Sequence, residues 1–206
     1  MARRGDKLRE HILWTAKDVF LELGFERTSM DEVASRAATS KRSLYAHLES
    51  KEKLFLAVIE LVRGLFLSRL GMPGDYPGQP AEGLVMFCGR YLETLLHEGS
   101  IRMFRLSAAE TARFPAGAAQ YFDVIFTEVH ARLSAYLKTT FDLSATVSFG
   151  MAQKLLGQVL YPRLPRALFG MDPLAKSLDD ETLSPDFDLT AIRIAVADLL
   201  SSLQKH

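Results

Sequence analysis

The chain has 206 residues, and its 25 lysines and arginines balance 25 aspartates and glutamates, so the formal net charge is zero. Hydrophobic residues make up 48% and charged residues 24% of the chain, which is typical of a globular protein and excludes a disordered or fibrous one. A single cysteine, Cys88, excludes an intramolecular disulfide and any multi-cysteine metal site. A neutral chain also lacks the basic excess of most nucleic-acid binders, unless its charges are unevenly placed.

Neither end nor middle of the chain carries a membrane signal. No segment approaches the roughly 18 uninterrupted apolar residues of a transmembrane helix. The first residues lead into a charged helix without the apolar run of a signal peptide. We therefore expect a cytoplasmic protein with no membrane partner.

Helical spacing of apolar residues begins near the N-terminus. Within residues 6–23 apolar side chains recur on one face, and Gly24 stands where a C-cap glycine would end a helix. Thr28-Ser29, Thr39-Ser40 and Ser50 then offer three successive N-caps. These caps predict a short helix to about residue 37, a second to about residue 49, and a longer helix over 51–70.

The rest of the chain also has the pattern of helices. Residues 71–80 contain three glycines and three prolines and cannot be helical. No useful length alternates with period two, so strands are not expected. The chain is predicted to be all-α, with about nine helices. Those beyond the loop cover about 81–97, 100–111, 116–140, 144–168 and 188–204.

Residues 28–51 have the layout of a helix-turn-helix. The first helix would bury Met30, Val33 and Ala37, and the second would turn Leu44 and Leu48 inward. The outward face of the second helix is polar and fits the major groove of DNA. Helix N-termini suit phosphate oxygens, because their N–H groups are free. The N-cap candidates are Thr28, Ser29, Thr39, Ser40 and Ser50. Periodicity alone does not distinguish this layout from any three-helix bundle.

The exact residues of this segment resemble the TetR family of transcriptional repressors. The resemblance covers about residues 6–55 and implies a DNA-binding domain over 1–55, a connecting helix over 51–70, and a ligand-binding and dimerisation domain over 56–206. Ala38 departs from the family's usual glycine, at a cost of about 1–2 kcal/mol if its conformation is left-handed. Thr39 replaces a usual aliphatic residue, and Leu48 a common aromatic. The matching residues are Phe25, Thr28, Ser29, Val33, Ala34, Ala37, Ser40, Leu44, Tyr45 and 50–54.

The resemblance implies roles at matching positions. Base-reading candidates are Lys41, Arg42 and Ser43. Phosphate contacts that fix the register are expected from Thr28, Ser29, Tyr45, His47 and Lys51. The alternative for the basic pair is a solvated helix face, and for Tyr45 a half-buried packing position. Arg3 and Arg4 either reach into the minor groove or lie in solvent.

A second resemblance lies further along the chain. Residues 105–115, RLSAAETARFP, resemble the AefR-like C-terminal subgroup of the same family. Large soft side chains on the surrounding helices predict a cavity for an apolar or aromatic ligand, although each taken singly is more often plain core. The candidate pocket residues are Met86, Phe87, Tyr91, Met103, Phe104, Phe122, Phe126 and Met151.

The last two predicted helices are apolar on two sides. Such a helix at the end of a chain needs a second partner besides its own core, and a second protomer would supply it. Gly150 and Gly157 would allow close backbone approach. The alternative is complete burial within the monomer. The candidate dimer residues are Phe149, Leu156, Leu160, Ile192, Val196, Leu199 and Leu200.

These patterns and the TetR resemblance together predict a DNA-binding transcriptional regulator. The resemblance implies a repressor that binds a palindromic operator as a homodimer and is released by a small apolar or aromatic inducer. The inducing direction comes from the resemblance. The alternatives are an all-α dimeric ligand-binding or interaction module without specific DNA binding, and a TetR-like activator. Scattered histidines and the lack of catalytic motifs predict no enzyme, no metal and no cofactor.

The neutral charge conceals an uneven distribution. Residues 1–70 carry 13 basic and 10 acidic side chains, a net +3, and residues 71–206 carry 12 and 15, a net −3. A charge of +3 is small for a DNA-facing surface. We therefore expect weak non-specific DNA affinity and a reliance on dimerisation for specific binding.

Overall fold

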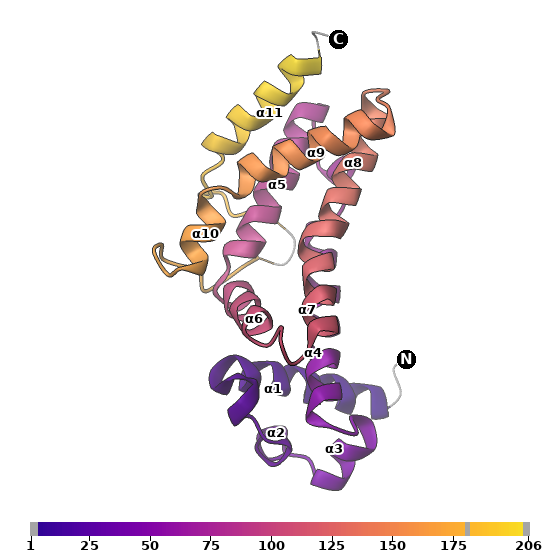
Figure 1. Cartoon of the computed structure of the whole chain (residues 1–206), viewed down its shortest axis with the longest axis vertical. Coiled ribbons are helices and arrows are strands. Elements are labelled where there is room, and N and C mark those ends of the chain that lie inside the picture. Colours follow the sequence, from indigo (N-terminus) through magenta and orange to yellow (C-terminus); the bar gives the residue numbers. More distant parts are fainter. Residues whose placement is uncertain (1–3, 180–181, 204–206) are drawn as a thin grey trace. The chain divides into compact units, whose positions relative to one another are not determined.

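A computed structural model describes residues 4–179 and 182–203, with the backbone alone for Arg4 (Figure 1). The side chains of Arg3 and Arg4, predicted either to reach the minor groove or to lie in solvent, are outside the described part. Every regular element within the described ranges is helical, which confirms the all-α prediction. No helix in these ranges is both long and apolar enough to cross a membrane.

The chain folds into two compact units. The first unit comprises residues 1–65 and 102–121, and the second comprises residues 66–101 and 122–206. Helices α4 (Lys51–Leu70) and α6 (Glu98–Ala109) each contribute residues to both units. Compactness thus groups residues 102–121 with the N-terminal helices, whereas the sequence predicted a single boundary near residue 55.

The first unit begins with α1 (Arg4–Arg27), α2 (Met30–Arg36) and α3 (Lys41–His47). Gly24 interrupts α1 with a φ of 75°, a conformation that glycine adopts without steric cost. This agrees with the glycine stop predicted after residue 23, although one further turn follows it. The break returns Phe25 to the core, where only 2% of its surface is exposed.

Four phenylalanine rings cluster in the first unit, and Phe20, Phe25 and Phe55 among them are buried. Phe25 lies 5.8 Å from Phe20 and 5.3 Å from Phe55, measured between ring centroids. Phe114, which immediately precedes α7 (Pro115–Phe122), lies 4.6 Å from Phe25 in an edge-to-face arrangement. The stretch that resembles AefR-like proteins therefore contacts the aromatic core of the N-terminal helices through the half-buried Phe114.

Helix α5 (Pro80–Leu96) is the central element of the second unit. Twelve of its residues are buried. It packs against α9 (Ala145–Leu160), α10 (Arg163–Leu168) and α11 (Thr190–Leu203), while α8 (Val129–Thr140) packs against α9. Helices α9 and α11 lie side by side (Figure 1). A helix surrounded in this way must be apolar around most of its circumference, as the sequence of α5 is.

Two of the predicted boundaries need correction. The helix predicted over 144–168 is wrong as one element, because Pro162 has no N–H to continue the hydrogen-bond ladder and separates α9 from α10. The loop predicted over 71–80 contains one short 3-10 turn, Pro73–Asp75. The helix predicted over 116–140 is confirmed as continuous helical backbone, with a π-helical stretch at Asp123–Glu128.

Candidate nucleic-acid interface

Serine hydroxyls begin the three helices that follow α1. The Ser29 Oγ accepts the N–H of Glu32 at 3.1 Å, and the Ser40 Oγ accepts that of Ser43 at 3.1 Å. The Ser50 Oγ accepts the N–H of Lys53 at 3.2 Å, at the start of α4. The predicted N-caps at these three serines are confirmed. At the paired positions, it is the serine and not the threonine that caps the helix.

The turn between α2 and α3 depends on a left-handed residue. Ala38 has a φ of 48°, as the departure from glycine suggested. Its N–H donates to the Ser35 carbonyl at 3.1 Å, and the Thr39 N–H donates to the Ala34 carbonyl at 3.0 Å. These two bonds are a Schellman motif, in which glycine is the usual left-handed residue. Ala38 therefore bears steric strain that a glycine would not.

Helix α3 is anchored by its inner face. Leu44 is fully buried and Leu48 is 4% exposed, and Met30, Val33 and Ala37 of the preceding helix region are buried as predicted. The opposite face of α3 presents polar side chains to solvent. Lys41, Arg42 and Tyr45 are exposed, while Ser43 and His47 are half-buried.

The two basic residues at the start of α3 differ in their partners. The Lys41 ammonium lies 2.7 Å from a carboxylate oxygen of Asp31, and this hydrogen-bonded partner raises the pKa of Lys41. Arg42 has no side-chain partner among the described residues. Its guanidinium, which presents five donors, is therefore the more available of the two for a base edge or a phosphate.

Arg36 joins α2 to α1. Its guanidinium bonds to Glu22 on α1, and its Nε lies 2.6 Å from Glu32 Oε1 on α2. The hydrogen bond from Arg36 is the main cause of the lowered pKa of Glu22. This contact could not be predicted from the sequence, because no local spacing links residues 22 and 36.

Two predicted phosphate contacts occupy internal positions instead. The side chain of Thr28 is buried, and its hydroxyl donates to the Gly24 carbonyl at 2.7 Å. The Lys51 ammonium donates to the carbonyls of Phe25, Glu26 and Thr28 at 3.0, 3.2 and 2.9 Å. It also lies 4.4 Å from the centroid of the Phe25 ring. Thr28 is therefore not placed to reach a phosphate, and Lys51 uses its three N–H groups to bind the end of α1.

The eight predicted pocket residues are divided between the two units. Met103 and Phe104 belong to the first unit, and the other six belong to the second. Phe122 is 54% exposed, whereas Tyr91 is fully buried and donates its hydroxyl to the Ile125 carbonyl at 2.7 Å. Phe87 and Met103 are also buried, and Met86, Phe104, Phe126 and Met151 are half-buried. The ligand cavity stays a prediction.

The predicted dimer residues lie on opposite sides of α9 and α11. Leu156, Ile192, Val196 and Leu199 are at most 6% exposed, so these four belong to the protomer's own core and not to a surface. Leu160 and Leu200 are half-buried. The outer faces carry other large apolar side chains besides Phe149, which is 55% exposed. They are Val147 and Ile194, at 47% and 59%.

Metal binding has no support in the described part of the chain, where no three histidine, cysteine or acidic side chains converge. Cys88 is fully buried, and burial raises the pKa of its thiol to about 12. The thiol is therefore protonated and chemically quiet near neutral pH.

The family model of the bacterial regulatory proteins of the tetR family matches residues 12–58, which include both helices of the helix-turn-helix. The chain belongs to the TetR family. A second model, the C-terminal domain of AefR-like transcriptional repressors, matches residues 82–143. Both models describe regulatory proteins, which agrees with the expectation that this TetR-family member is not an enzyme.

Relatives with curated names match over less than half of the chain. The chain is 43% identical over 63 residues to the HTH-type transcriptional activator FasR of Mycolicibacterium smegmatis, across 28% of this chain and 29% of FasR. It is 31% identical over 93 residues to the HTH-type transcriptional repressor NicS of Pseudomonas putida, across 44% of each. The matches thus span less than half of these relatives.

Solved structures match over nearly the whole chain. A TetR-family regulator from Mesorhizobium loti superposes with a TM-score of 0.74 at 20% identity, covering 99% of this chain and 98% of the other. The flavonoid-responsive regulator FrrA superposes with a TM-score of 0.72 at 26% identity, covering 97% and 96%. The fold of this TetR-family chain is therefore that of known regulators.

The strain at Ala38 leads to a stability prediction. We expect Ala38→Gly to raise the free energy of unfolding by about 1 kcal/mol, because glycine adopts the left-handed conformation without the Cβ clash. Thermal and urea unfolding would measure this change. The same substitution at Ala46, an exposed helical position on α3, is the matched control and should destabilise the protein by about 1 kcal/mol. Destabilisation by both variants would contradict the strain.

Proposed function

We propose that the chain is a transcriptional regulator that binds a palindromic operator as a homodimer, through α3 of each protomer. The observation that carries this proposal is Arg42, which is exposed and has no side-chain partner among the described residues. It lies on a helix whose inner face is buried and which belongs to the segment that the family model matches. Such a helix offers its N-terminal side chains to base edges in the major groove. A regulator of this kind would act in the cytoplasm.

Helix α3 supports specific roles for its side chains. We assign base reading to Arg42, with Lys41 and Ser43 beside it, since Arg can donate two bonds to a guanine edge. Phosphate contacts are assigned to the exposed Ser29, Ser40 and Tyr45 and to the half-buried Thr39 and His47. In this assignment Thr28 and Lys51 position the motif and do not touch DNA.

We favour repression over activation, because the matched C-terminal model is that of AefR-like repressors and NicS is named a repressor. Activation is the second candidate. FasR, which is 43% identical over 63 residues, is named an activator. An in vitro transcription assay on the selected operator would distinguish the two directions.

Arg42→Ala is expected to remove sequence discrimination. An operator is first selected from random duplexes, and affinity is then compared between it and a scrambled duplex. Each lost bidentate contact should cost about 1–3 kcal/mol on the operator and much less on the scrambled duplex. Arg63→Ala, on α4 and paired with Glu60 at 3.1 Å, removes the same charge and is the control. Equal losses on both duplexes would refute base reading by Arg42.

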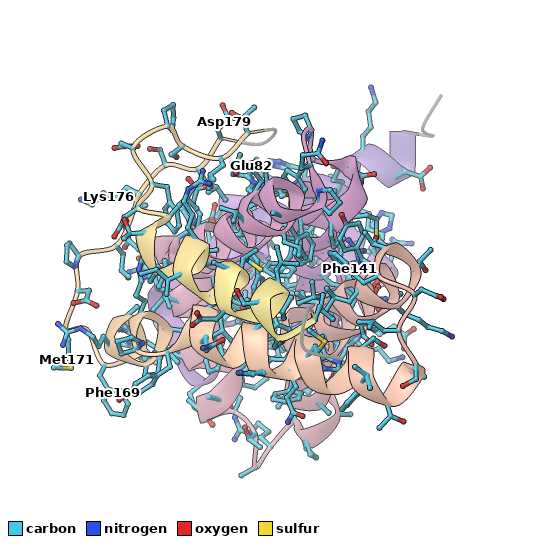
Figure 2. The ribbon with its side chains drawn as sticks, turned by 90° about the horizontal axis from the view of Figure 1, so that it is seen from above. Glu82, Phe141, Phe169, Met171, Lys176 and Asp179 are labelled. Atoms are coloured by element: carbon cyan, nitrogen blue, oxygen red, sulfur yellow. The ribbon has the colours of Figure 1, made fainter. Side chains whose placement is uncertain are left out.

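The proposed dimer uses the outer faces of α9 and α11, which lie side by side in Figure 2. Phe149 and Ile194 are exposed there, and a side chain placed at Gly150 or Gly157 would meet nothing within 4 Å. Two such faces related by a two-fold axis would form a four-helix interface. A dimer would also place two copies of α3 on one operator.

Ile194→Arg is expected to dissociate this dimer. A buried arginine without a partner costs about 3–5 kcal/mol, and the symmetric interface would receive two of them. Light scattering or sedimentation at micromolar concentration should then find a monomer with unchanged helical content. Thr139→Arg, at an exposed position of α8, is the control and should stay dimeric. A wild-type monomer, or a dimeric Ile194→Arg variant, would exclude this interface.

We further propose an apolar or aromatic effector that carries a hydrogen-bonding group. FrrA is named flavonoid-responsive, and flavonoids combine aromatic rings with hydroxyls. Ser107 on α6, which is 4% exposed, has a hydroxyl with no hydrogen-bond partner among the described residues. An unpaired buried hydroxyl is costly, and a ligand that bonds to it would recover that cost. Met103 lies one helical turn before it.

Ser107→Ala should therefore stabilise the free protein by about 1 kcal/mol, because the unpaired hydroxyl is removed. The same variant should bind a flavonoid several-fold more weakly by titration calorimetry. Ser148→Ala is the control: Ser148 is 1% exposed, but its hydroxyl already donates to the Ala145 carbonyl at 3.1 Å. That variant should not gain stability. Destabilisation by Ser107→Ala, with flavonoid binding unchanged, would contradict the role of Ser107.

A further inference from the structure

The C-terminal turn of α4 is held by three side chains of the second unit. A helix end leaves its last carbonyls without intrahelical partners. Tyr76 donates its hydroxyl to the Leu70 carbonyl at 2.6 Å, and burial raises the pKa of this tyrosine to about 12, so it remains a donor. The other acceptors are the Leu67 and Gly71 carbonyls, which Arg132 binds at 3.4 and 2.7 Å, and the Arg69 carbonyl, which Arg90 binds at 3.3 Å.

Arg90 also binds the segment before α11. We call residues 182–189 the strap. Arg90, only 1% exposed, donates from Nη1 to the Thr182 carbonyl at 2.8 Å and to Glu93 Oε2 at 2.8 Å. Its Nη2 donates to the carbonyl of Asp179, a residue labelled in Figure 2. Glu93 completes the arrangement by accepting the Ser184 N–H at 3.0 Å.

The strap therefore supplies part of the hydrogen bonding of a buried ion pair. If the strap leaves, Arg90 loses the Thr182 carbonyl and Glu93 loses the Ser184 N–H. Buried charges that lose partners are strongly unfavourable, so the pair must move towards water or other acceptors. Either movement takes the Arg90 Nε away from the Arg69 carbonyl. The docking of the strap and the end of α4 are thus coupled through one guanidinium.

Helix α5 leaves room for the strap by using a glycine. A Cβ on Gly89 would lie 2.5 Å from Leu189 Cδ2 and 3.1 Å from Leu183 Cδ2. Both leucines belong to the strap. Glycine is unfavourable inside a helix, so its presence next to Arg90 fits a close approach of the strap at this turn of α5.

We propose that the strap is a regulatory latch: docked on Arg90 and Glu93 it fixes the C-terminal turn of α4, and its release lowers the affinity for the operator. Helix α4 continues from this turn to Lys51 beside the helix-turn-helix, so its end is a point from which DNA binding can be controlled. The effect on DNA rests on the proposed function. The coupling between the strap and α4 is independent of the proposed function.

Gly89→Ala in the full chain tests the latch, because the added methyl group crowds Leu189 and Leu183 of the strap while favouring the helix that carries it. On this proposal the crowding weakens the docking of the strap. Hydrogen exchange should become at least tenfold faster at the Ser184 amide and several-fold faster at the amides of the last turn of α4. Exchange in α9 should not change. Affinity for the selected operator should fall about tenfold.

The double variant Gly89→Ala/Leu189→Ala makes room for the added methyl group. Its exchange rates and its operator affinity should therefore return to those of the single variant Leu189→Ala. Ser184→Pro removes the N–H that Glu93 accepts and should release the strap independently. Faster exchange in the strap with an unchanged α4 turn would overturn the latch. Unchanged exchange at the Phe187 amide, which donates to the Ser184 carbonyl, in both Gly89→Ala and Ser184→Pro would also overturn it. A wild-type protein that binds no DNA would refute the proposed function, while exchange would still decide the coupling.

Discussion

The insertion of Phe25 into the core of the first unit is the contact on which the helix-turn-helix depends. The chain reverses at Gly24, and this returns the Phe25 ring to Phe20 and Phe55. Lys51 lies over one side of the same ring while binding three carbonyls at the end of α1. The start of α4 and the end of α1 are therefore fixed to each other, and α2 and α3 lie between these two points in the chain.

Phe114 brings a distant segment into the same core. It contacts Phe25 and Phe55, and the neighbouring Arg113 forms an ion pair with Glu26. Gly117 follows on α7, where a Cβ would lie 2.8 Å from the side chain of Leu56 on α4. A change in the position of residues 113–117 would therefore alter contacts with both α1 and α4. With the latch proposed at the other end of α4, the connecting helix would be held near both of its ends.

Local chemistry explains which features could be predicted from the sequence. A serine N-cap acts within three residues, and a C-cap glycine within one turn, so Ser29, Ser40, Ser50 and Gly24 could be recognised. The strained Ala38 could also be anticipated, because the family pattern has a glycine there. The apolar face of α3 follows from the spacing of Leu44 and Leu48 alone.

Long-range contacts explain what the sequence could not predict. Lys51 has the composition of a surface residue, and nothing near it reveals the carbonyls more than twenty positions earlier that it binds. Helix α11 has apolar residues on two sides, and periodicity cannot tell which side is the protomer's own core. Ile192 and Val196 proved to be core, whereas Ile194 between them is exposed. Arg90 and Glu93 carried no signal, because their partners in the strap are some ninety residues away.

Several basic side chains of the first unit form ion pairs, so its small positive charge is only partly available to DNA. Lys41 is paired with Asp31, Arg36 with Glu22 and Glu32, and Lys53 with Glu49. A cation that already has a carboxylate partner releases fewer counterions on meeting a phosphate, so the salt-dependent part of DNA affinity is reduced. Arg42 lacks such a partner among the described residues, but a few uncompensated cations supply little non-specific attraction. The proposed homodimer would place two recognition helices on one duplex, and the spacing between these helices would then be the quantity that an effector regulates.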